Sequence, residues 1–353
     1  MAGSGAGPVR AIVGGMTVSV LTGRAPVTGA GPGRLRLGVC AATVAACVPY
    51  LGLKIAWLSG STVGWNDTEA AKESALYVGN AITLGMDAIA VVVVLAFTFR
   101  WGLRVPAWLV LTPMWIGAGL LAPIALAVPL GALVQTLFSS EPLTASDSAL
   151  QGWVFGVVYT GFALQGVGLL TAFVLYARGR WPDVFAVRTK DVAKGATHAL
   201  QVLLARTAGV FAAAFAAVQL YWAFGGTAGI RAEQLDDRGA VQQLADGVMG
   251  LMALAGAVAL LAIVRRAGRP ERFAVPLAGV WIGAGATFAW SFYRLITLLS
   301  QPEFLDSGSS SALNLTTLSG LLAGLLMGVT GAVLLAERDA GVQSARPTAS
   351  RTP

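Results

Sequence analysis

The sequence predicts an all-α fold, a polytopic transmembrane bundle of eight helices built as two tandem parallel four-helix repeats. Three observations support this prediction. The composition is 56% hydrophobic and 12% charged with a mean hydropathy of +0.72, which lies outside the range of soluble domains. Eight stretches reach the length of about 20 apolar residues that a membrane crossing needs. Two short motifs recur at nearly the same spacing, once in each half of the chain.

The expected spans follow from the uninterrupted apolar runs. They cover residues 36–58, 77–99, 107–132, 152–177, 203–224, 244–264, 273–299 and 313–336. The third run stays apolar as far as Phe138 and contains Pro113, Pro123 and Pro129. It is too long for one straight crossing, so it predicts a kinked helix or a helix followed by an interfacial segment.

The recurring motifs define the two repeats. The pentapeptide Trp-Ile-Gly-Ala-Gly begins at Trp115 and again at Trp281, 166 residues later. The motif Trp-x-x-Gly-x-Thr-x-Gly begins at Trp57 and again at Trp222, 165 residues later. Each repeat holds an even number of spans, so both enter the membrane in the same direction. A pseudo-two-fold axis along the membrane normal would relate them.

Composition shifts set the boundaries of the repeats. The chain divides into a disordered N-terminal tail (1–33), a first repeat (34–178), a basic loop (179–202), a second repeat (203–337) and a disordered C-terminal tail (338–353). The apolar run at residues 11–21 also reads as a poor signal peptide, but glycines interrupt it, which favours the tail.

The basic residues indicate the orientation in the membrane. Lys and Arg gather in residues 10–36, 100–104, 178–206, 265–272 and 338–351, whereas the intervening loops hold most of the acids. Because cytoplasmic loops carry the excess of Lys and Arg, both termini are expected to be cytoplasmic in a cell-membrane protein. The net charge of +7 is therefore a signal of topology. No nucleic acid is expected as a partner; the expected partners are the lipid bilayer, another membrane protein or a second copy of the chain.

No cofactor or metal is expected. His198 is the only histidine, which excludes a bis-histidine haem in the bundle and a histidine-rich di-iron cluster. Cys40 and Cys47 lie two turns apart on one helix, which excludes a disulfide between them. The sequence also lacks the common nucleotide-binding and hydrolase motifs. No motif in the sequence indicates catalysis.

Three charged residues inside the expected spans, Lys54, Asp87 and Arg294, form the candidate intramembrane polar site. A charge at such depth costs at least about 2.5–3.5 kcal/mol unless it is paired or hydrated. In one interpretation Lys54 and Arg294 extend to the headgroups, and Asp87 is a structural partner of Lys54 or a protonated carboxyl. In the other, Lys54 and Arg294 cap an outward cavity that attracts an anion, and Asp87 beneath them handles a proton or cation.

The repeated motifs are the second set of candidate residues. The set comprises Trp57, Gly60, Thr62 and Gly64 with Trp222, Gly225, Thr227 and Gly229, and it adds Trp115 and Trp281. Tryptophan at a helix end is a common interfacial anchor, and Gly and Thr beyond it favour a tight turn. The alternative is the rim of a ligand site. Trp115 and Trp281 are expected deeper in the membrane, where they either pack between the repeats or line a path between them.

The pattern Leu53-Lys54-x-x-Trp57 followed by Gly60-x-Thr62-x-Gly64, in an Ala/Gly/Val/Leu-rich bundle, resembles uncharacterised multi-pass membrane proteins of high-GC Gram-positive bacteria. That resemblance implies the eight-span bundle over residues 34–338. It implies no activity and no site residues, because the family has no assigned activity. The second repeat departs from the pattern, with Gln219 in place of the lysine.

Three functions are compatible with these features. The first is a small transporter or flippase with a path between the repeats, which requires a cavity that includes at least two of the three intramembrane charges. The second is a non-catalytic membrane partner or sensor subunit, in which the charges are buried pairs. The third is a membrane-embedded enzyme that acts on a lipid-linked substrate, with ionisable groups converging on a lateral opening.

Overall fold

The computed structural model describes residues 33–69, 74–138, 150–230, 235, 238–300 and 311–344. Within these ranges eight helices are long and apolar enough to cross a membrane, which confirms the all-α transmembrane bundle. They are α2 (Arg34–Leu58), α3 (Ser74–Thr98), α4 (Ala107–Phe138), α5 (Gly152–Arg180), α7 (His198–Ala223), α9 (Ala240–Val264), α10 (Ala274–Ser300) and α11 (Ser311–Ser344). Each one coincides with an expected span.

The third span is one uninterrupted helix. All three prolines of α4 lie inside it, and it continues to Phe138 without a separate interfacial segment. Proline leaves a backbone carbonyl without its helical donor, which a membrane helix tolerates when neighbouring helices and local adjustments compensate. Here α5, α9 and α10 all pack against α4.

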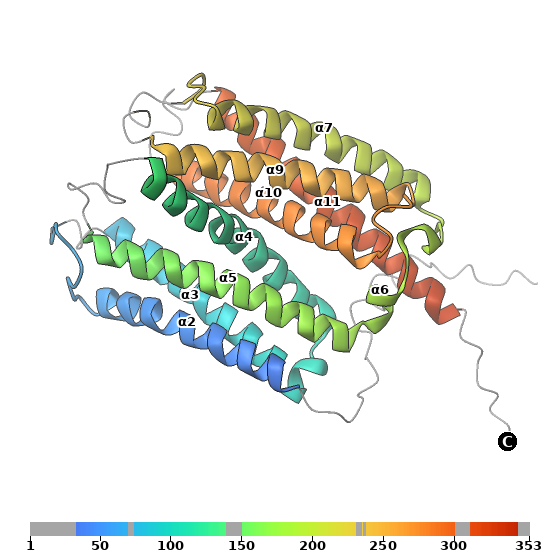
Figure 1. The fold of residues 1–353 in the computed structure, drawn as a ribbon, viewed down its shortest axis with the longest axis horizontal. Coiled ribbons are helices and arrows are strands. Elements are labelled where there is room, and N and C mark those ends of the chain that lie inside the picture. Colours follow the sequence, from blue (N-terminus) through green and yellow to red (C-terminus); the bar gives the residue numbers. More distant parts are fainter. Residues whose placement is uncertain are drawn as a thin grey trace, which may run out of the picture.

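The helices form two groups of four with the same order of neighbours. In the first group α2 packs on α3 and α5, and α4 packs on α5; in the second, α7 packs on α9 and α11, and α10 packs on α11 and α9. The groups lie side by side in Figure 1 and meet where α4 packs against α9 and α10. We call them the first and second units.

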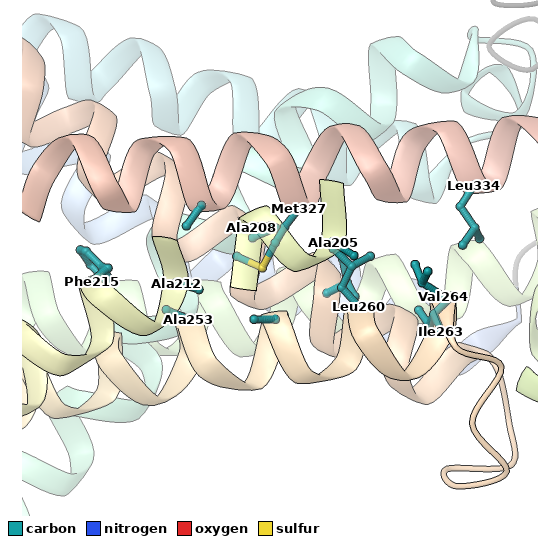
Figure 2. Packing of buried hydrophobic residues seen from close by; sticks show 14 of the residues in the cluster. Ala205, Ala208, Ala212, Phe215, Ala253, Leu260, Ile263, Val264, Met327 and Leu334 are labelled. Carbon is teal, nitrogen blue, oxygen red and sulfur yellow. The ribbon is translucent and has the colours of Figure 1, made fainter. Parts of the chain in front are cut away.

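Each unit has its own hydrophobic core. The second-unit core, drawn in Figure 2, uses many small side chains such as Ala205, Ala208, Ala212 and Ala253 between larger ones such as Met327. Small side chains allow helix backbones to approach closely, and the resulting van der Waals packing helps helices to associate in lipid. The first-unit core includes Cys40, which is buried and free, as is Cys47.

One end of the bundle holds the basic loops, and we call it the basic end. The beginning of α2, the end of α11 and the short helix α6 (Pro182–Ala186) lie there together (Figure 1). The linker after α5, expected to be a plain loop, contains α6 and the 3-10 turn η3 (Thr189–Asp191). A second 3-10 turn, η2 (Arg100–Leu103), joins α3 to α4.

The C-terminal tail is shorter than expected. The disordered C-terminal tail was expected from residue 338, but α11 remains helical through Ser344. Glu337 and Arg338 explain part of this extension. Glu337 accepts hydrogen bonds from the Thr197 backbone and the Gln201 side chain, both at 2.8 Å, and Arg338 donates to the Asp183 carbonyl at 2.9 Å. Residues 1–32 and 345–353 lie outside the described ranges.

Candidate functional site

Lys54 and Asp87 meet inside the first unit. Lys54 Nζ lies 3.5 Å from Asp87 Oδ2, which joins α2 to α3. The two residues are 0% and 7% exposed, so the ion pair is sealed from the surface of the bundle. The span in α3 begins at Tyr77, which places Asp87 about 15 Å along the helix axis from that end. The pair is therefore an intramembrane one.

Polar and aromatic groups from three helices surround this ion pair. The Tyr50 ring centroid lies 4.2 Å from Lys54 Nζ, one helical turn earlier on α2. Gln165 of α5 lies beside the Asp87 carboxylate, and Thr83 of α3 lies beside Tyr50. An aromatic face attracts a cation, so the ring partly replaces the water that Lys54 gives up on burial. We call these five residues the α2–α3 polar cluster.

The ion pair is longer than an ideal one. Charge-assisted hydrogen bonds between nitrogen and oxygen usually measure about 2.7–2.9 Å. Within the part of the chain that the structure describes, neither Lys54 Nζ nor Asp87 Oδ2 has a hydrogen-bond partner. Two buried charges held mainly by Coulomb attraction can serve as a fixed link between helices or exchange a proton between themselves. Those are the two chemical capacities of the cluster.

Arg294 is not part of this cluster. Grouping it with Lys54 and Asp87 was wrong, because its charged neighbours are Asp246 and Arg238 in the second unit. Arg238 forms an ion pair with Asp246 and also donates to the Trp222 carbonyl at 3.0 Å. The chain thus has a second polar group, near the end of the bundle opposite the basic end.

Asp246 is the functional candidate that sequence reasoning missed. It is only the third residue of the expected span 244–264, where an acid resembles an ordinary boundary residue. One signal was available, since Asp246 follows Asn80 by the repeat offset of 166 residues. Polar residues at matching positions in the two halves of the chain were a sign that Asp246 is more than a boundary residue.

The Trp-x-x-Gly-x-Thr-x-Gly motif forms a turn that ends α2 and α7. Trp57 Nε1 donates to the Val63 carbonyl at 2.8 Å, and Trp222 Nε1 donates to the Ala228 carbonyl at 3.0 Å, six residues onward in each case. The four glycines have positive φ: Gly60 (87°), Gly64 (79°), Gly225 (88°) and Gly229 (84°). Glycine adopts this conformation without steric cost, which explains its recurrence. Thr62 and Thr227 supply turn carbonyls, which accept from Trp65 and Ile230 at 3.1 Å.

The repeated pentapeptides lie at the contact between the two units. Gly119 of α4 is in direct contact with the Gly285 backbone of α10, so no side chain separates the helices there. Trp115 stacks on Phe288 at 5.2 Å, and Trp281 stacks on Phe173 at 5.5 Å. Trp115 packs on the core of the second unit, whereas Trp281 packs on the core of the first. The tryptophans therefore pack between the units, each into the opposite one.

Comparisons with protein-family models, with curated proteins and with solved structures give no match. The resemblance to multi-pass proteins of high-GC Gram-positive bacteria stays a prediction.

Proposed function

We propose that the protein is a non-catalytic subunit of the cell membrane, with both termini in the cytoplasm, that acts by binding another transmembrane chain. The basic end supports this orientation. It contains Arg and Lys at the beginning of α2, in η2, between α5 and α7, between α9 and α10, and late in α11. Such a concentration is typical of cytoplasmic loops.

The sealed α2–α3 polar cluster is the observation that carries this proposal. A transport site must exchange its ligand with water, but Lys54 is wholly buried and Asp87 nearly so. The contact between units is also filled, because Gly119 contacts Gly285 and stacked aromatic side chains flank that contact. Residues packed in this way support a structural role better than a path for a solute.

The lipid-facing side of α2 supports binding of another helix. Gly38, Ala45 and Gly52 are exposed and spaced seven residues apart, which places them on one face. Nothing lies within 4 Å of a Cβ built on Gly38 or Gly52. In the second unit, by contrast, Gly250 and Gly256 of α9 each face a neighbouring helix closely. This chain uses bare glycine for helix contacts, and on α2 the glycine has no intramolecular neighbour.

A second copy of this chain is the partner that we propose for α2. The internal contacts Gly119–Gly285 and Gly256–Gly283 pair glycine with glycine, and a second α2 would offer the exposed glycines of α2 the same kind of contact. A two-fold dimer places the same face of both copies in contact. Close backbone approach then stabilises the pair in lipid.

Disulfide crosslinking in native membranes tests this dimer. Ala45→Cys should form a crosslinked dimer on mild oxidation, because two copies of the exposed face would lie against each other. The native Cys40 and Cys47 are 1% and 4% exposed, so they provide little background. Val210→Cys, on the exposed side of α7, is the matched control and should stay monomeric.

The possible outcomes separate the proposals. Monomer alone from Ala45→Cys, in a membrane where the protein is folded, would rule out the α2 dimer. A crosslinked product of another size would replace the second copy by a different membrane protein and keep the subunit function.

Transport is the second candidate, because the incomplete hydrogen bonding of the Lys54–Asp87 pair favours a group that can exchange a proton. Reconstituted vesicles test it directly. A proton or solute flux that the wild-type protein supports above protein-free vesicles, and that Asp87→Asn abolishes while it remains folded in the vesicles, would establish transport. Equal leakage from vesicles with either protein would eliminate it.

A further inference from the structure

Two loops at the basic end are joined into one ordered structure. The Thr189 amide donates to the Glu271 carbonyl at 2.8 Å, and the Thr189 hydroxyl donates to the Pro270 carbonyl at 2.9 Å. The Phe273 amide donates to the Val187 carbonyl at 3.1 Å, and Arg188 forms an isolated β-bridge with Arg272. The segment after α6 is thereby held against the connection between α9 and α10.

Arg266 fixes the other side of this structure. Its φ of 56° is in the left-handed region, which is unusual for a residue other than glycine. Its guanidinium donates to the carbonyls of Val192 at 2.8 Å, Ala193 at 2.9 Å and Ile263 at 2.6 Å. Backbone strain that is compensated by several hydrogen bonds occurs preferentially at functional sites.

A cavity of about 160 Å³ lies between the two loops, lined by Arg188, Lys190, Gly268 and Glu271. Among the described residues, no ion pair or side-chain hydrogen bond is formed by Arg188, Lys190 or Glu271. The cavity is smaller than the roughly 300–1,000 Å³ of pockets that hold drug-sized ligands. Its occupant would be a compact group, and the excess of positive charge favours an anionic one.

The cavity lies where a membrane helix meets the interface. Gly268 comes four residues after the end of α9 at Val264, and Glu271 comes three residues before α10 begins at Ala274. Both helices are membrane spans. A site at this depth is accessible to lipid headgroups and to the aqueous phase.

We propose that this cavity binds a phosphate group. Arg188 offers a planar guanidinium that matches two phosphate oxygens, and Lys190 adds a second cation. Gly268 brings no side chain, and nothing lies within 4 Å of its Cβ position, so the occupant can approach the backbone. Glu271 repels a bare anion but accepts a hydrogen bond from a hydroxyl next to the phosphate, as in phosphatidylglycerol.

Paired binding experiments on the full chain in phosphatidylcholine nanodiscs test the site and its source of phosphate. One arm measures retention of phosphatidylglycerol by native mass spectrometry, and the other measures inorganic phosphate by ³¹P NMR titration. The double variant Arg188→Gln/Lys190→Gln should weaken binding in at least one arm by about tenfold, the effect of about 1.4 kcal/mol. An effect on the lipid alone identifies a headgroup site, and an effect on phosphate alone identifies a soluble ligand.

The control is Arg104→Gln/Lys194→Gln, which removes two exposed cations from the same end of the bundle outside the cavity. It should leave binding unchanged. If both double variants weaken binding equally, or neither does, the basic end attracts anions only through its general charge and the site does not exist. Arg188 and Lys190 are exposed, so an unchanged melting temperature confirms that their variants remain folded.

The variant Glu271→Gln should change the affinity for phosphate in the opposite direction. Removal of the negative charge of Glu271 should tighten the binding of inorganic phosphate by a few-fold, because the repulsion between the carboxylate and the anion disappears. Weaker binding by this variant would show that the proposed geometry is wrong.

Discussion

Lys54 and Asp87 show that a charged residue in a membrane span predicts a partner of opposite charge. Each was identified as a candidate because a lone charge in the bilayer is costly, and an opposite charge is the usual remedy. The structure pairs them at 3.5 Å. Tyr50 and Gln165 could not be predicted as their neighbours, because an aromatic ring in a span demands no charged partner and a buried amide can be satisfied by many different groups.

The interdependence of the ion pair gives a prediction for stability. Asp87→Asn leaves the Lys54 ammonium buried without a counter-ion, which should destabilise the fold by about 3–5 kcal/mol. The double variant Lys54→Met/Asp87→Leu, which removes both charges, should recover most of that loss. Thermal unfolding in detergent measures both. Equal losses in Asp87→Asn and in the double variant would mean that the unpaired Lys54 charge is not what destabilises the single variant.

The long helices were the most predictable elements. Each of the eight apolar runs matches a helix in the described part of the chain, although α11 extends beyond its expected end. The sequence also predicts tight turns after α2 and α7, because Gly and Thr beyond a span favour such turns. The indole hydrogen bonds across those turns were not foreseen. Nothing in the spacing of Trp57 shows that its ring donates to the carbonyl of Val63, six residues onward.

The two turns predict matched effects of substitution. Gly60→Ala and Gly225→Ala should each destabilise the protein by about 1 kcal/mol, because alanine is strained at positive φ. Space is not the cause, since nothing lies within 4 Å of either Cβ position. Gly156→Ala, at an equally open helical position in α5, should be neutral or stabilising. Equal losses for all three in unfolding experiments would refute the role of φ.

At the scale of the whole molecule, the sequence predicted two similar units but not how they join. The repeated pentapeptides lie in the interface, where Trp115 and Trp281 each pack on the core of the opposite unit. The two-fold relation of the repeats stays a prediction, which the matching order of helix neighbours supports. The failure at Arg294 belongs to this scale, because depth in a span does not reveal which helices are neighbours.

Two glycines of α4, Gly117 and Gly119, should differ strongly in how far alanine at their position weakens the association of the units. Gly119→Ala places a Cβ against the backbone of Gly285, so it should destabilise the contact by about 1–3 kcal/mol. Gly117→Ala, two residues earlier, places a Cβ at an ordinary 3.6 Å from Leu169 and should be tolerated. Co-purification of the two halves after proteolysis between α5 and α7 measures the association. Equal association for both variants would contradict the contact.

The bare contact of Gly119 with Gly285 also has a mechanical consequence. Sliding α4 along α10 would bring the side chain of Ala118 or Ala284 toward the point where Gly119 meets Gly285. An atom added at Gly119 meets the Gly285 backbone, and both alanines are already wholly buried, so there is no room for this movement. The crossing therefore resists translation of one unit along the other, which fixes the relative depth of the two units across the bilayer.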